Sequence, residues 1–284
     1  MRPLREFDEK QVDIGGVPTR FLVAGEGPPM VLLHADGDNR LDWRWVLEGL
    51  ATHHRVYAPD LPGFGGTAVL QNCSPEFFEG FVHQFLDTLR LEAPILVGNS
   101  LGGLAALRLA LHAPDRVSAL CLVGSVGLGS EVNFALRQLA VPGVGEAAIW
   151  WGRTSIGAAQ RVLLRLPLLF ANPALAPRPW LVEQYRLARL PGFLSTTLAA
   201  LRAQVQPTGQ KQVLASDLPR LSVPTLLVWG DRDLVVPVKQ ARAAARLLAC
   251  GGLEIITNTG HLPHVERPEK FVAALSGFFA GSRG

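Results

Sequence analysis

The chain has 284 residues, 48% of them hydrophobic, and a formal net charge of +3. This length and apolar content exclude a disordered or fibrous protein and favour one compact α/β unit with an insertion. Three cysteines without CxxC spacing exclude a disulfide framework, and no apolar run in the sequence is long enough for a predicted membrane span. We therefore expect a soluble, cytoplasmic protein.

Short apolar runs alternate with helical patterns, which predicts a mostly parallel sheet covered by helices on both faces. The first two runs are expected to pair as a hairpin. A helix is predicted to begin after Ser74, with Pro75 at its first position. The eight predicted strands span residues 11–14, 19–24, 29–34, 55–58, 94–98, 117–124, 225–229 and 253–256.

The alternation of predicted strands and helices is interrupted between about residues 129 and 217. Helical patterns interrupted by prolines fill this stretch, which lacks convincing strands and therefore predicts an inserted helical cap. Residues 128–216 carry nine basic and three acidic side chains, a net charge of +6. Their scattered spacing argues against a nucleic-acid partner. We favour a solvated outer face for these cations; alternatively, one or two, with Arg186 and Arg189 as candidates, attract a substrate carboxylate.

The most informative motif is GNSLGG at residues 98–103, which follows an apolar run and precedes a helical pattern. A sharp turn between strand and helix would expose the Ser100 hydroxyl, and the flanking glycines would let the two elements approach closely. Because such a motif also occurs by chance, it indicates a nucleophilic serine only if matching residues follow later in the chain.

An acid and a histidine follow in matching contexts, each just after a predicted strand. Asp231 and Asp233 follow one strand, and His261 follows the last strand, with His264 three residues further on. The order of serine, acid and histidine resembles that of α/β-hydrolases. The chain is identified as a member of this superfamily, in the group with a helical cap, over nearly its whole length.

The resemblance implies a role for each of three residues. Ser100 would be the nucleophile, His261 the general base, and Asp233 the acid that orients the imidazole. Asp233 fits the family pattern GxxDxxxP, whereas Asp231 is expected to brace the loop. Residues 260–268 resemble the family stretch GHxxHxExP, in which the first histidine is catalytic, so we favour His261 over His264. An HxxH pair can also suggest a metal site.

The oxyanion hole is expected to use two backbone N–H groups. Leu101 follows the nucleophile at a helix N-terminus and would supply one. The family pattern carries the second over to Asp36, but this loop reads HADGD where the family usually has HGxG or HGxP. Ala35 thus replaces a glycine, which costs energy if that position needs a positive φ. We read the Asp36 side chain as an ordinary turn aspartate.

The resemblance implies an α/β-hydrolase fold with a core of residues 1–127 and 218–284 and a cap of residues 128–217. It implies hydrolysis of a small-molecule carboxylic ester with a small to medium acyl chain, and no metal or organic cofactor. Trp150 and Trp151 are the favoured apolar lining from the cap.

Hydrolysis of thioesters, lactones or amides and cofactor-free perhydrolysis stay open, and two further alternatives rest on particular residues. Carbon–carbon bond hydrolases of vinylogous diketo acids share the GNSxGG elbow, although Leu262 stands where that family usually has an aromatic residue. A receptor-like protein with slow turnover is the other alternative, because Ala35 and Asp36 depart from the usual oxyanion loop.

Overall fold

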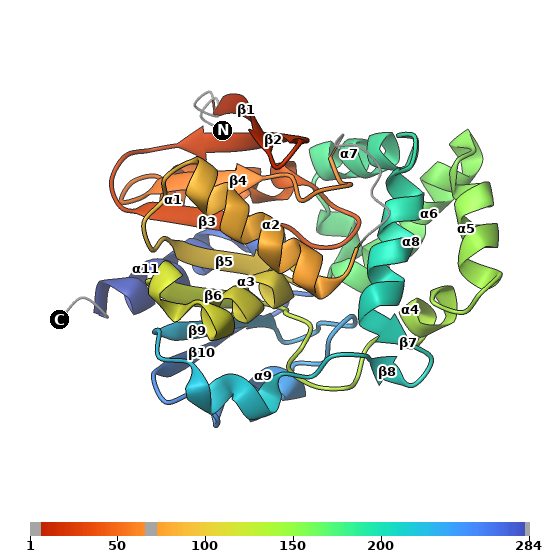
Figure 1. Cartoon of the computed structure of the whole chain (residues 1–284). Helices are drawn as coiled ribbons and strands as arrows, with labels where there is room; N and C mark the ends of the chain where they lie inside the picture. Colours follow the sequence, from red (N-terminus) through yellow and green to blue (C-terminus); the bar gives the residue numbers. More distant parts are fainter. Residues whose placement is uncertain (1–6, 66–72, 282–284) are drawn as a thin grey trace.

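The computed structural model describes residues 7–65 and 73–281 and contains one eight-stranded sheet (Figure 1). The spatial order is β1-β2-β4-β3-β5-β6-β9-β10, with β2 antiparallel to both of its neighbours and the remaining pairs parallel. The predicted sheet and its initial hairpin are confirmed. The strands are β1 (Asp8–Ile14), β2 (Val17–Ala24), β3 (Pro29–Leu33), β4 (Arg55–Pro59), β5 (Ile95–Asn99), β6 (Ala119–Val123), β9 (Thr225–Gly230) and β10 (Gly251–Ile256).

Helices cover both faces of the sheet because its central strands are apolar on both sides. In β5, Leu96 contributes to one buried cluster and Val97 to the other, since successive side chains of a strand point to opposite faces. The first cluster packs under α2 (Pro75–Thr88), α3 (Leu101–His112) and α9 (Lys239–Ala245), and the second under α1 (Arg44–Leu50) and α11 (Pro268–Gly281). Three short helical turns lie between these elements: η1 (Arg40–Trp43), η2 (Pro114–Arg116) and α10 (Pro263–Glu266).

The helix predicted after Ser74 is present as α2. The Ser74 hydroxyl accepts a hydrogen bond from the backbone N–H of Phe77 at 3.2 Å, and Pro75 occupies the first turn. Its buried aromatic residues, including Phe78 and Phe85, belong to the core. These aromatics therefore stabilise the fold.

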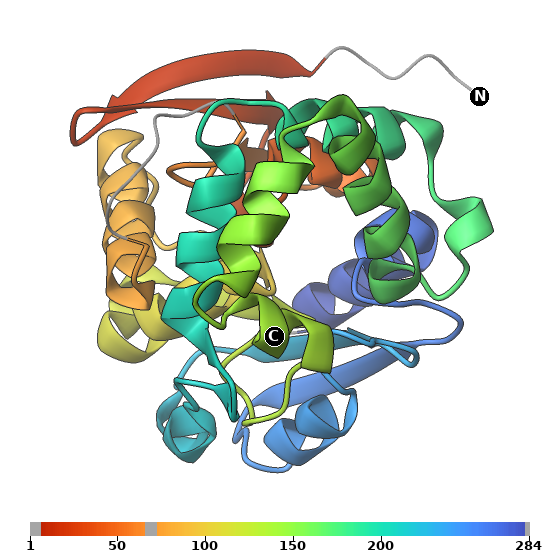
Figure 2. The same ribbon diagram turned by 90° about the vertical axis from the view of Figure 1, so that its right-hand side faces the viewer.

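The helical insertion between β6 and β9 is confirmed. It lies beyond the carboxyl ends of the central strands and faces the viewer in Figure 2. One expectation was wrong: the segment contains a small antiparallel hairpin, whose two-residue strands are too short to give a hydrophobic pattern. The insertion comprises α4 (Phe134–Leu139), α5 (Val144–Gly152), α6 (Ser155–Leu169), η3 (Pro173–Leu175), α7 (Arg178–Ala188), α8 (Phe193–Gln204), β7 (Val205–Gln206), β8 (Gly209–Gln210) and η4 (Ala215–Arg220).

Among the helices of the described residues, none combines the length and the apolar character that a bilayer crossing requires.

Candidate active site

Ser100 occupies a tight turn between β5 and α3. Its φ of 52° and ψ of −111° are unusual for a residue with a side chain, and such strain is typical of functional turns. The turn needs glycine nearby: a Cβ added to Gly98 would lie 2.3 Å from the carbonyl oxygen of Gly102, and one added to Gly102 would lie 2.3 Å from that of Leu33. The close approach of strand and helix places Ser100 in the wall of a large cavity.

His261 lines the same cavity and pairs with Asp233. Its Nδ1–H donates to Asp233 Oδ2 at 2.8 Å, and both side chains are buried. The other carboxylate oxygen accepts backbone N–H bonds from Val235 at 2.8 Å and Val236 at 3.0 Å. These bonds fix the carboxylate, which in turn fixes the orientation of the imidazole.

The second acid and the second histidine are used elsewhere. Asp231 accepts the backbone N–H of Thr259 at 3.2 Å and braces the loop after β10. His264 is buried and stacks on Trp43, with ring centroids 4.2 Å apart. Burial and the nearby His261 lower the pKa of His264 to about 3. Within the described residues, no group of His, Cys, Asp or Glu side chains could hold a metal ion.

Two residues that support the Asp233–His261 pair were missed in the sequence. Asn99 donates from Nδ2 to the carbonyl oxygens of Val123 at 2.8 Å and His261 at 3.2 Å. Gly124, with φ +49°, lies directly under the pair: a Cβ there would be 3.0 Å from His261 Nδ1 and 3.1 Å from Asp233 Oδ2. The available signal was the position of this glycine at the end of the predicted strand 117–124.

The loop after β3 is held by His34. This buried ring donates from Nδ1 to the carbonyl oxygen of Ala35 at 2.8 Å and accepts the N–H of Leu61 at Nε2, also at 2.8 Å. Burial lowers the pKa of His34 to about 4, consistent with a neutral ring in both contacts. The described non-glycine residues with positive φ do not include Ala35, whereas Gly37 has φ +75°. The methyl group of Ala35 therefore causes no strain of that kind.

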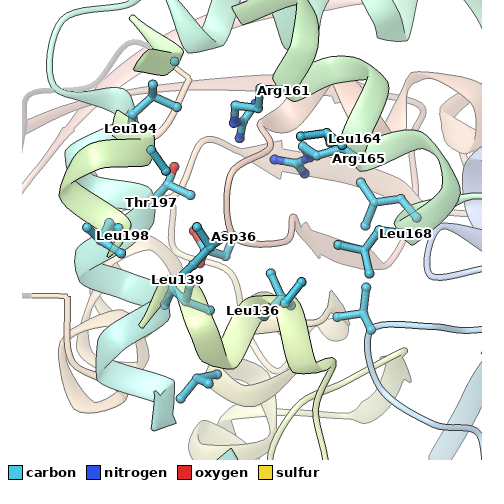
Figure 3. A pocket seen from close by; sticks show the side chains of 18 of the residues that line it. Asp36, Leu136, Leu139, Arg161, Leu164, Arg165, Leu168, Leu194, Thr197 and Leu198 are labelled. Atoms are coloured by element: carbon cyan, nitrogen blue, oxygen red, sulfur yellow. The ribbon is translucent and has the colours of Figure 1, made fainter. Parts of the chain in front are cut away.

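The Asp36 side chain was misread from the sequence. It lines the cavity, and its Oδ1 is buried and accepts no hydrogen bond from the described residues (Figure 3). Burial raises the pKa of Asp36 to about 8, in spite of the opposing charge of Arg165. It is therefore a desolvated carboxyl group in the cavity wall rather than a solvated turn aspartate. The cap covers this loop, which local sequence could not indicate.

The cavity has two arginines from α6 beside this carboxyl group. Arg165 donates to Asp38 Oδ1 at 2.9 Å and to the carbonyl oxygen of Gly37 at 3.0 Å. Among the described residues, the Arg161 guanidinium donates one long hydrogen bond, 3.4 Å, to the side chain of Gln184. Burial, with Arg165 nearby, lowers the pKa of Arg161 to about 9. The guanidinium of Arg161 thus keeps unused donors within the cavity.

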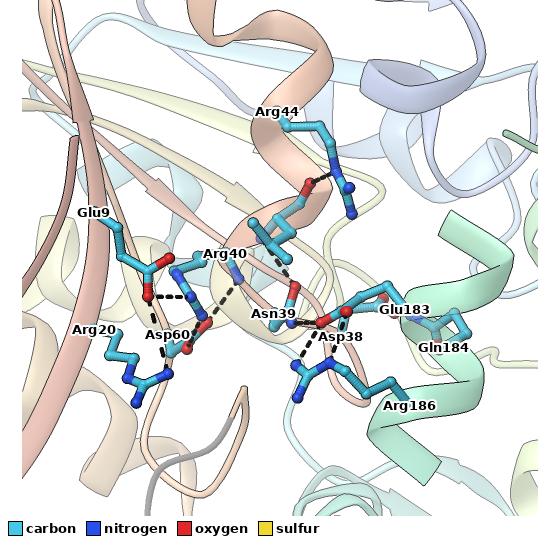
Figure 4. A network of polar contacts seen from close by, with 11 residues as sticks. Glu9, Arg20, Asp38, Asn39, Arg40, Arg44, Asp60, Glu183, Gln184 and Arg186 are labelled. Atoms are coloured by element: carbon cyan, nitrogen blue, oxygen red, sulfur yellow. Dashed lines mark hydrogen bonds and ion pairs between the residues drawn. The ribbon is translucent and has the colours of Figure 1, made fainter. Parts of the chain in front are cut away.

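Arg186 and Arg189, the candidates under the alternative of a substrate carboxylate site, lie outside this cavity lining. Arg186 pairs with Glu183 at 2.7 Å, and Glu183 also accepts a hydrogen bond from Asn39, which joins α7 to the loop after β3 (Figure 4). Arg189 donates to the hydroxyl of Ser155. A buried ion pair between Arg40 and Asp60, 2.6 Å long, continues the network through the core.

The cavity has a volume of about 700 Å³ and is lined mainly by apolar side chains from the cap. Trp151 is part of this lining. Trp150 is not: it is 73% exposed, because one residue along a helix turns the side chain by about 100°. Leu101 is buried at the first position of α3, directly after Ser100. The leucines of the lining are Leu136, Leu139, Leu164, Leu168, Leu169, Leu194, Leu198 and Leu201.

The sequence and structure match known proteins over most of their length. A family model described as alpha/beta hydrolase fold matches residues 28–268. An uncharacterized protein of Mycobacterium tuberculosis is 30% identical, covering 98% of this chain and 84% of that protein. The 2-hydroxy-6-oxo-6-(2'-aminophenyl)hexa-2,4-dienoic acid hydrolase of Metapseudomonas resinovorans is 29% identical, covering 96% and 91%. The crystal structure of a membrane phospholipase A, a bacterial virulence factor, superposes with TM-score 0.81 at 27% identity, covering 98% and 87%. This chain belongs to the alpha/beta hydrolase fold family.

Proposed function

We propose that the protein is a serine hydrolase that cleaves carboxylic esters with medium-length apolar acyl chains. The observation that carries this proposal is that Ser100 and His261, the latter paired with Asp233, line the same leucine-rich cavity of about 700 Å³. That volume lies in the upper part of the range typical of small-molecule sites. The apolar wall would stabilise an acyl chain, while the few polar groups would orient the ester.

The chemistry would proceed through an acyl-enzyme. Ser100 Oγ attacks the ester carbonyl while His261 Nε2 accepts its proton, and Asp233 stabilises the resulting imidazolium. The backbone N–H groups of Leu101 and Asp36 stabilise the oxyanion. His261 then gives the proton to the departing alcohol, and a water molecule activated by the same ring releases the acid.

The protonated form of Asp36 fits this mechanism. With its pKa raised to about 8 by burial, the carboxyl group is mostly protonated near neutral pH. A neutral group adds no negative charge beside the developing oxyanion, which an ionised aspartate would oppose. The departure from the usual loop sequence is therefore compatible with turnover.

A fluorophosphonate probe tests the proposed nucleophile, and a series of p-nitrophenyl esters tests the chain length. We expect labelling at Ser100, located by peptide mass spectrometry, and a kcat/KM that rises from acetate to an optimum near the octanoate. Labelling at another residue, or a maximum at acetate, would contradict the proposal.

One observation favours a second candidate, the hydrolysis of a carbon–carbon bond in a vinylogous diketo acid. Arg161 presents free donors in the cavity, and a guanidinium is well suited to bind a carboxylate. The dienoic acid hydrolase of Metapseudomonas resinovorans is also similar along most of its length. Loss of the absorbance of such a dienoate on mixing, with no turnover of the esters, would favour this candidate.

A further inference from the structure

Helix α6 has the reverse of the usual polarity. Its only two charged residues, Arg161 and Arg165, line the cavity. Its outer face is apolar instead: Ile156 is 72% exposed, Leu163 65% and Leu164 66%. A helix on the surface of a soluble protein normally turns its charges outward and its leucines inward.

Helix α5 continues this apolar surface. Trp150 is 73% exposed and Trp151 42%, and the indole N–H of Trp151 donates to the side chain of Gln160 on α6 at 2.6 Å. Because this bond joins exposed side chains of the two helices, their outer faces form one surface. The two helices make up the outer edge of the cap in Figure 1 and face the viewer in Figure 2. We name the set Trp150, Trp151, Ile156, Leu163 and Leu164 the apolar hairpin surface.

The apolar hairpin surface reaches the rim of the cavity. Trp151 and Leu164 belong to both, since they are exposed outside and also line the cavity. Phe134 of α4, which is 64% exposed, likewise lines the cavity. An apolar chain could therefore pass from this surface into the cavity without crossing a polar belt.

The charges around the α5–α6 hairpin distinguish between two possible occupants of the apolar hairpin surface: a second copy of the chain and a lipid surface. Helix α5 carries one acidic residue, Glu146, which pairs with Arg202. Residues 147–182 contain no aspartate or glutamate, and Arg153 lies exposed in the turn between α5 and α6. A second copy of this face would place no carboxylate of residues 147–182 opposite Arg153. An anionic lipid surface complements both the cations and the exposed tryptophans, which favour the boundary between head groups and acyl chains.

We propose that the α5–α6 hairpin docks on an anionic lipid surface and brings the mouth of the cavity against it. Docking follows from the outer surface alone, whereas the cleavage of lipid-borne esters there rests on the proposed function. The helices lie in the interface with their apolar side chains among the acyl chains, and Arg153 contacts the head groups.

Sedimentation with vesicles tests the docking. Wild-type protein is mixed with phosphatidylcholine vesicles with or without phosphatidylglycerol. We expect binding to the anionic vesicles that weakens with added salt. The Ile156→Asp, Leu163→Asp double variant should bind at least about tenfold more weakly, because charges replace the inserted apolar side chains. Neither residue lines the cavity. Leu247→Asp, at an exposed leucine of the core, should bind like wild type.

Three results would overturn the docking proposal: no binding of wild type, equal binding of the double variant, or a wild-type dimer that the same substitutions dissociate. A thermal melt and turnover of the soluble p-nitrophenyl butyrate report folding of each variant. Trp150→Asp serves as a second variant if the double one unfolds. If the ester is not turned over by wild type, the proposed function fails while vesicle binding still decides the docking.

Discussion

Asp36 places a carboxyl group next to the backbone amide that would help to stabilise the oxyanion. Burial raises its pKa to about 8, so the group is neutral below that pH and ionised above it. We expect kcat to fall as pH rises through about 8, because the new negative charge opposes the oxyanion. Asp36→Asn, which keeps the amide and the shape, should remove this decline in a pH–rate profile.

The raised pKa of Asp36 also predicts how the free energy of unfolding depends on pH. Between about pH 4 and about pH 8 the folded state keeps the Asp36 proton and the unfolded state releases it. The free energy of unfolding therefore falls across this window, by at most about 1.4 kcal/mol per pH unit from this group. Urea unfolding of Asp36→Asn should show a gain over wild type that grows from about pH 5 to about pH 8. A constant difference would show that Asp36 ionises normally.

At the scale of elements, the residue that follows β6, Gly124, packs closely against the side chains of Asp233 and His261. A methyl group on Gly124 would press on both side chains, at 3.0 and 3.1 Å. We expect Gly124→Ala to lower kcat about tenfold or more, since a small displacement of a general base is costly. Gly16→Ala is the matched control, because it also has a positive φ but nothing within 4 Å of the added carbon. Equal effects of the two variants on kcat would mean that backbone strain alone is responsible.

The central elements could be predicted from the sequence because each depends on neighbours along the chain. Apolar runs mark β5, β9 and β10, and the loops after them carry Ser100, Asp233 and His261. The cavity could not be predicted, since it depends on how the cap helices rotate over the core. That rotation puts Arg161 inside rather than Arg186, and Trp151 rather than Trp150. It also covers Asp36, whose burial no local pattern reveals.

At the scale of the whole molecule, the cap is bonded to the loop that carries His261. The backbone N–H of His261 donates to the carbonyl oxygen of Leu169 at the end of α6, at 2.8 Å. Glu266 accepts the N–H groups of Gly260 at 2.5 Å and Ala171 at 3.0 Å, and so joins the same two segments. Cap and core thus position the histidine together.

Removing the Glu266 side chain should therefore affect both stability and turnover. Glu266→Ala leaves buried N–H groups without partners, which costs about 1–3 kcal/mol of stability. We expect kcat to fall more than KM rises, because the histidine is displaced while the apolar cavity is retained. Glu269→Ala, on the exposed start of α11, should leave both quantities unchanged. A lower melting temperature with normal kcat would limit Glu266 to a structural role.

The central claim is that Ser100 carries the reaction within one cavity formed by core and cap. The most direct test compares kcat for p-nitrophenyl octanoate between wild type and Ser100→Ala, with circular dichroism to verify that the variant is folded. We expect a loss on the order of 10⁶-fold, because serine, histidine and aspartate act as a unit in such a reaction. A folded Ser100→Ala protein that keeps wild-type turnover would contradict it.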